Sequence, residues 1–129
     1  MKKTLLLLIG IFLLLAPVLC AAEAGVSRAL FTTGVENREP VDKLTATDTA
    51  LKTLFFFTEI NDMAGEQVLH RWVYNGQVMV EVPFTIGGPR WRVYSSKQMI
   101  PGWVGKWRVD VVNAAGEVVA SKEIERSAM

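Results

Sequence analysis

The side chains best suited to chemistry are those of His70, the only histidine in the chain, and of Ser95 and Ser96. A serine nucleophile needs a base beside it, so a hydrolase would have to combine His70 with one of these serines. Neither serine lies in a G-x-S-x-G turn, and Ser95-Ser96-Lys97 lacks the S-x-x-K spacing. The sequence therefore predicts a protein that is not an enzyme, with a hydrolase as the least favoured alternative. His70 is expected to be partly buried, with satisfied ring nitrogens.

Metal and cofactor sites are not indicated. One histidine and one cysteine cannot build a usual zinc site. The loop that holds Glu59, Asn61, Asp62 and Glu66 offers oxygen ligands, but it lacks the D-x-[DN]-x-[DN]-G spacing of a calcium loop. We therefore expect no metal and no cofactor.

Arginine and tryptophan cluster in three segments of the chain: His70-Arg71-Trp72, Arg90-Trp91-Arg92 and Trp103 with Trp107-Arg108. Because side chains of a strand alternate between its two faces, we expect the tryptophans inside and the arginines outside. The predicted core includes Phe56, Trp72, Trp91 and Trp107.

A functional interpretation of the same cluster is a solvent-facing strip that binds carboxylate, phosphate or sugar-acid groups. Its predicted members are Arg71, Arg90, Arg92 and Lys97, with His70 and Glu59 beside them. Glu59 shares the strand parity of Phe55 and Phe57, so it is expected near a buried face, where a lone carboxylate is costly. We therefore predict an arginine partner for Glu59, either Arg71 or Arg92.

The N-terminus reads as a secretion signal. Lys2 and Lys3 precede an apolar run over residues 5–16, and Pro17 with small residues follows. Residues 1–22 are predicted to be the signal peptide, with cleavage after Ala22 or Ala24, and the protein is expected to be exported to the periplasm. The alternative is an uncleaved segment that anchors the chain to the inner membrane.

Charge and cysteine content limit the partners. Without Lys2 and Lys3, twelve of the fourteen basic residues remain against thirteen acidic ones, so no nucleic-acid partner is expected. The only cysteine, Cys20, leaves with the signal, so no disulfide supports the fold.

The mature chain is predicted to be all-β. Alternating patterns and turn residues indicate strands over 26–36, 54–60, 67–74, 77–86, 90–97, 104–112 and 118–124, whereas 41–53 is expected to be a loop. Asn75-Gly76 predicts a tight hairpin, and Pro83 predicts an edge strand or a bulge. About seven strands at this spacing favour one antiparallel β-sandwich of immunoglobulin-like type over residues 26–129, with a small barrel as the alternative.

Several motifs resemble the bacterial family catalogued as domain of unknown function 2914. They are Arg28 to Thr32, Arg38-Glu39-Pro40, Phe56 to Glu59, His70-Arg71-Trp72, Gly88 to Arg92 with Ser95-Ser96-Lys97, and Gly105-Lys106-Trp107 with Gly116. The resemblance spans about residues 27–125. It implies a β-rich domain associated with the cell envelope, and it lends no catalytic role to any residue.

We therefore expect an exported binding domain of the cell envelope. Its partner would be a protein or an anionic envelope polymer held by the arginine and tryptophan residues. The alternative is an assembly domain that pairs with another chain through an exposed edge strand.

Overall fold

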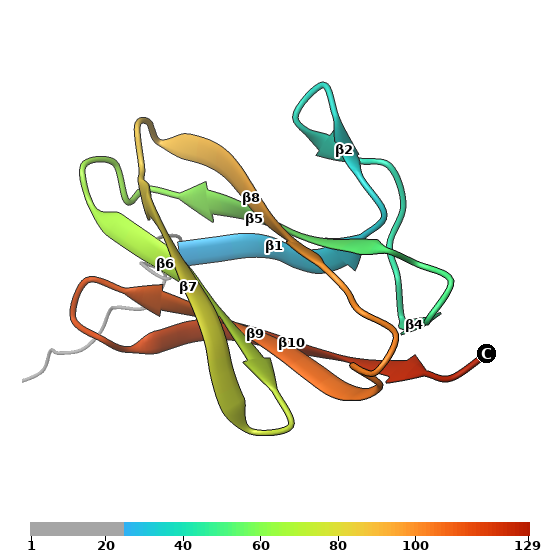
Figure 1. Ribbon diagram of the computed structural model, residues 1–129. Helices are drawn as coiled ribbons and strands as arrows, with labels where there is room; N and C mark the ends of the chain where they lie inside the picture. The colour runs from blue at the N-terminus through green and yellow to red at the C-terminus, as the bar shows by residue number, and fades with distance from the viewer. Residues whose placement is uncertain (1–24) are drawn as a thin grey trace, which may run out of the picture.

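The computed structural model describes residues 25–129, which form strands joined by turns and loops (Figure 1). The predicted signal peptide lies outside these residues. The strands are β1 Gly25–Thr32, β2 Val35–Glu36, β3 Glu39–Pro40, β4 Ala46–Asp48, β5 Thr53–Asn61, β6 Gln67–Tyr74, β7 Gln77–Thr85, β8 Arg90–Gln98, β9 Gly105–Asn113 and β10 Val118–Ser127. No helix that could cross a membrane occurs in this part of the chain.

The strands form two main sheets with the core between them. One sheet has the order β1-β5-β8, the other has the order β4-β10-β9-β6-β7, and β2 and β3 form a separate small hairpin. In the view of Figure 1, β1 and β5 lie above β9 and β10, and the β2–β3 hairpin projects at one end. The all-β prediction is confirmed, and the arrangement resembles a sandwich.

The core is built by alternate residues of the facing strands. Phe56, Trp72 and Trp107 have no exposed surface, whereas Trp91 is partly buried and packs against the same cluster. Trp72 meets the ring of Trp107 edge to face at 6.4 Å between centroids. This geometry adds to the free energy gained by burying large apolar side chains. All four aromatic residues predicted for the core thus contribute to it.

Most strand boundaries agree with the prediction, and the differences involve short elements. The long strand expected over 26–36 instead ends at Thr32, after which β2 and β3 turn back through Asn37 and Arg38, both with positive φ. The loop expected over 41–53 contains the short strand β4, which pairs in parallel with β10. The seven long strands pair with one another only in antiparallel fashion, so the parallel pair of β4 with β10 is the departure from the predicted sheet.

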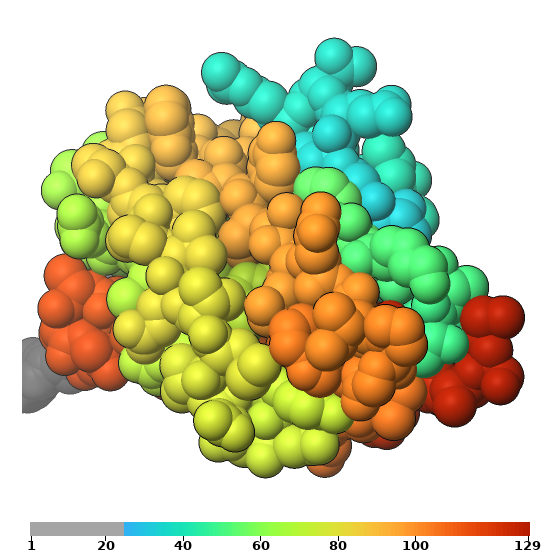
Figure 2. All heavy atoms as spheres, in the orientation of Figure 1, coloured from blue at the N-terminus to red at the C-terminus, as the bar shows by residue number. Residues whose placement is uncertain are grey.

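Each of the two main sheets has a free edge on the same side of the molecule. β7 and β8 are the edge strands there, and they lie on the face turned toward the viewer in Figure 2. Asn75 and Gly76 connect β6 to β7 with positive φ, as the hairpin prediction requires. Pro83 lies in β7, which is an edge strand as predicted.

Candidate functional site

His70 is at the centre of a buried polar network. Its Nε2 lies 3.0 Å from Oγ1 of Thr58, its Nδ1 lies 2.7 Å from Oγ of Ser95, and the Trp72 indole donates to the same serine oxygen at 3.0 Å. The residue is fully buried, and this burial lowers the pKa of His70 to about 3.

This network resembles part of a hydrolase site only in its distances. A neutral histidine 2.7 Å from a serine has the spacing of a nucleophile and its base. However, Thr58 and His70 have no exposed surface and Ser95 is 7% exposed, so a substrate cannot reach the pair. The arrangement satisfies the hydrogen bonds of buried polar groups in the core. Because it is buried there, His70 is not available as the binding residue that was predicted.

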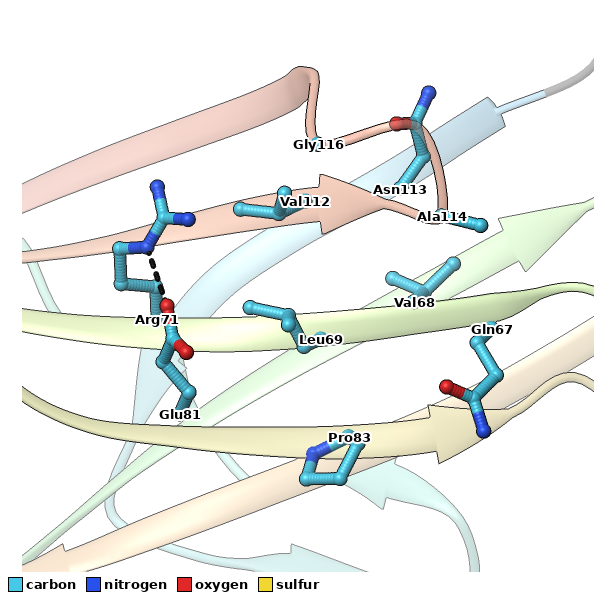
Figure 3. Close-up of a pocket in the computed structure, with 10 residues that line it drawn as sticks. All are labelled: Gln67, Val68, Leu69, Arg71, Glu81, Pro83, Val112, Asn113, Ala114 and Gly116. Atoms are coloured by element: carbon cyan, nitrogen blue, oxygen red, sulfur yellow. Dashed lines mark hydrogen bonds and ion pairs between the residues drawn. The ribbon is translucent and has the colours of Figure 1, made fainter.

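The predicted strip of cations is not assembled as expected. Arg71 lies on β6 in the five-stranded sheet, where its Nε donates to Glu81 at 2.8 Å (Figure 3). Arg90, Arg92 and Lys97 all lie on β8 in the other sheet. Arg71 is therefore removed from the predicted strip, because the two strands belong to different sheets.

The hollow beside Arg71 is shallow. Figure 3 shows it between β6, β7 and the turn after β9. Its volume is about 310 Å³. Its charged side chains, Arg71 and Glu81, already bind each other, and Leu69, Pro83 and Val112 supply apolar surface around them. This hollow offers no group that requires a ligand.

Five charged side chains gather on the outer face of the three-stranded sheet, and we call them the arginine–glutamate cluster: Arg28, Glu39, Glu59, Arg90 and Arg92. Arg28 binds Glu39 with both terminal nitrogens at 2.9 Å and also binds Glu59 through Nε at 2.9 Å. Arg90 donates to Glu59 at 3.0 Å and 3.2 Å, and Arg92 donates to Glu39.

The partner predicted for Glu59 was therefore of the right type but the wrong residue. Arg28 and Arg90 bind Glu59, instead of Arg71 or Arg92. Arg92 faces Glu59 in the register of β5 and β8, but its guanidinium reaches Glu39 of β3. Folding of the β2–β3 hairpin onto the sheet brings Glu39 there, and strand alternation alone could not predict this.

The guanidinium groups strongly stabilise the ionised carboxylates. Hydrogen bonds from Arg28 and then Arg92 lower the pKa of Glu39 to about 2. The pKa of Glu59 is also lowered to about 2, chiefly by the hydrogen bond from Arg90. Both glutamates are charged at neutral pH, so the cluster holds three cations and two anions.

Lys97 also lies on β8, but its side chain points away from the arginine–glutamate cluster and toward Trp103. Its ammonium group lies 4.7 Å from the centroid of the Trp103 ring, an arrangement typical of a cation–π contact. Tyr94, in contrast, shares the outer face with Arg90 and Arg92 and is 49% exposed. Together, Arg90, Arg92 and Lys97 give β8 three basic residues, and the strand has no acidic one.

Within residues 25–129, the backbone of β8 has no partner along its outer edge. Asp62 donates to the carbonyl of Pro89, and Met99 donates to the carbonyl of Lys52, so odd-numbered residues of this stretch bond to β5. The register between β5 and β8 is regular throughout. Because bonding direction alternates along an antiparallel strand, the N–H and C=O groups of Arg92, Tyr94 and Ser96 point to the free edge.

Metal binding finds no support in residues 25–129, where no group of three or more candidate ligands occurs. Asp62, from the loop considered for calcium, has positive φ and forms part of the turn after β5.

Sequence reasoning missed two structural arginines. Arg28 joins both glutamates of the cluster, and its only signal was its place in the family motif. Arg126 is 1% exposed and donates hydrogen bonds to the carbonyls of Leu51, Ile100 and Trp103. These hydrogen bonds hold two loops against β10. Nothing in the sequence of the last strand predicted that the side chain of Arg126 would be buried.

Comparison with known proteins gives a family and no named relative. No curated protein matches the chain. Residues 65–125 match the family described as "Protein of unknown function (DUF2914)", a match that runs from the turn before β6 into β10. It covers the arginine-bearing strand β8, whereas the resemblance seen in residues 28–40 lies outside it. Residues 65–125 are therefore similar to the DUF2914 family of unknown function, in agreement with the resemblance seen in the sequence.

Proposed function

We propose that this protein is an exported, non-enzymatic binding domain of the cell envelope that takes up an extended acidic segment of a partner protein. The segment adds as a new strand to the free edge of β8. The observation that carries the proposal is a regular, unpaired edge strand with three basic residues and no acidic one.

Backbone hydrogen bonds supply the first part of the argument. The free N–H and C=O groups of Arg92, Tyr94 and Ser96 match those of an added strand, as in β-strand addition to other sheets. The edge has no proline and no bulge between Arg90 and Gln98 that would interrupt the new pairing.

Charge supplies the second part. A second copy of β8 would place like charges opposite each other, which disfavours pairing between identical edges. Acidic side chains on the outer face of an added strand would instead meet the arginine–glutamate cluster, whose three cations exceed its two anions by one charge and whose Arg90 side chain remains 58% exposed beside Glu59. The basic residues thus select against self-association and in favour of an acidic partner.

The neighbouring edge strand β7 is less suitable. Ile86 exchanges backbone hydrogen bonds with Gly65 and Glu66, so odd-numbered residues such as Pro83 face the free edge there. Pro83 removes a donor from that edge, and a register shift in its pairing with β6 interrupts the strand near Met79. Proline and bulges are the devices that protect sheet edges from pairing.

Three details of the proposal have separate support: export, the immunoglobulin-like arrangement, and a role other than catalysis. The N-terminal pattern of lysines, apolar residues and small residues supports export to the periplasm. Seven long antiparallel strands in two sheets support an immunoglobulin-like arrangement. The inaccessible His70–Ser95 pair supports a role other than catalysis.

The test uses a synthetic peptide of alternating glutamate and valine, with binding measured by titration calorimetry. Arg90→Ala with Arg92→Ala removes two partly exposed charge contacts, so we expect affinity to fall by about tenfold. The matched control, Arg71→Ala with Lys106→Ala, removes the same charge from the other sheet and should bind like the wild type. A lysine–valine peptide should not bind.

Backbone pairing is tested separately at Tyr94. Tyr94→Pro removes a donor that faces the free edge without removing a bond to β5, whereas Tyr94→Ala removes only the side chain. We expect Tyr94→Pro to lose binding at the β8 edge and Tyr94→Ala to keep it. Equal binding by these two variants would contradict strand addition and point to an anionic polymer held by side chains alone.

A further inference from the structure

We propose a second binding site for an acidic extended segment of a partner protein, along the free edge of β1 on the opposite side of the three-stranded sheet. The site is a groove between β1 and β10, flanked by Lys43 and Lys122. It goes beyond the β8 site and uses none of its residues.

The groove is formed by two strands that belong to different sheets. It has a volume of about 500 Å³ and is lined by β1, by Lys43, and by Ala120 and Lys122 of β10. A smaller hollow of about 200 Å³ shares Ala29, Lys43 and Lys122 and extends the groove toward Leu44. The two hollows together follow the edge of β1.

The first backbone pairing that an added strand would make with β1 already exists in the structure. Leu44 bridges to Phe31 in antiparallel fashion, and its N–H donates to the Phe31 carbonyl at 2.9 Å. The chain then leaves this edge, because β4 pairs with β10 instead. The positions that it would have filled next to residues 28–30, on the regular side of the register shift between Val26 and Arg28, are therefore open.

The backbone direction places free groups in this opening. Because the Phe31 carbonyl points away from β5, the N–H and C=O groups of Ala29 point the same way, and the register is regular from Arg28 to Thr32. An incoming strand that continues the Leu44 pairing would bond to Ala29 and fill the groove.

Two lysines determine the charge of the partner. Lys43 and Lys122 are both exposed, and neither forms an ion pair within residues 25–129. Glu123, which lines the smaller hollow, lies 3.7 Å from Lys106 and so has a cation of its own. Two unpaired ammonium groups beside an unpaired strand edge favour a segment with carboxylate side chains.

The test counts bound peptides and locates them. Calorimetry of the full chain with the glutamate–valine peptide should give two sites in the wild type. Arg90→Ala with Arg92→Ala should weaken one of the two sites by about tenfold and leave the other unchanged, and adding Lys43→Ala with Lys122→Ala should weaken the second site by a similar factor. The control Arg71→Ala with Lys52→Ala removes the same charge outside both sites and should keep both of them.

Carbodiimide coupling locates the peptide independently, since it joins a glutamate carboxylate to a nearby lysine amine. We expect adducts on Lys43 and Lys122 at least several-fold above those on Lys52 and Lys106. A single site in the wild type, weakened about tenfold by Arg90→Ala with Arg92→Ala, would overturn the second site and leave the proposed function intact. Absence of binding by the wild type would overturn both, and coupling spread evenly over the exposed lysines would also overturn the second site.

Discussion

At the scale of the residue, His70 dominates the chemistry of the interior. The prediction that its ring nitrogens are satisfied is correct, but the side chain is fully buried and not partly buried as expected. Its partners Thr58 and Ser95 come from the other sheet, so they could not be predicted without knowing how the sheets stack. The same limit explains why Glu59 was assigned the wrong arginines.

Burial of His70 makes stability depend on pH. The folded protein resists protonation until about pH 3, whereas the unfolded chain takes up the proton near pH 6.5. As the pH falls through this range, the unfolded state binds more protons, so the free energy of unfolding should drop by up to about 1.4 kcal/mol per pH unit. Denaturant unfolding between about pH 6.5 and pH 5 measures this slope.

His70→Gln provides the matched comparison, because its side chain cannot take up this proton. The variant is expected to be less stable at neutral pH, since a buried hydrogen-bond network is altered. Its stability should nevertheless change much less between about pH 6.5 and pH 5. A wild-type stability that stays constant across this interval would contradict the buried, neutral histidine.

At the scale of the element, the long strands were predictable and the short ones were not. Alternation over eight or nine residues identified β6, β7 and β8 nearly to their ends, and Asn75-Gly76 identified the hairpin. β2, β3 and β4 span only two or three residues each, which is too short for any periodic signal. Their positions depend on tertiary contacts such as Glu39 with Arg28.

The β2–β3 hairpin is held to the sheet by Glu39, and this contact can be tested. Glu39→Gln should weaken the bonds to Arg28 and Arg92, and amide exchange in residues 35–40 should become several-fold faster while the core strands are unchanged. Glu36→Gln, in the same hairpin, is the control, since Glu36 forms no ion pair within residues 25–129. Equal exchange in both variants would show that the ion pairs do not hold the hairpin.

Acid should have a similar effect on this element. The folded-state pKa values of Glu39 and Glu59 are lowered to about 2, below their ordinary value of 4.5. Their contribution is therefore fully present above about pH 4.5 and is lost as the pH falls toward 2.

At the scale of the whole molecule, the proposed function depends on which sheet edges are open. The five-stranded sheet protects its β7 edge with Pro83 and a bulge, whereas both edges of the three-stranded sheet keep free backbone groups beside basic side chains. The sequence indicated that an edge strand and an arginine-rich strand exist. It could not show that β8 is both regular and unpaired, because that depends on the order of strands in the sheet.

The most direct test is amide exchange in β8, followed by NMR with and without the glutamate–valine peptide. Strand addition predicts that the amides of Arg92, Tyr94 and Ser96 exchange at least about tenfold more slowly when the peptide is bound, since new hydrogen bonds protect them. The amides of Val93 and Ser95, already bonded to β5, should change little. Unchanged exchange at Arg92, Tyr94 and Ser96 in the presence of saturating peptide would contradict the account.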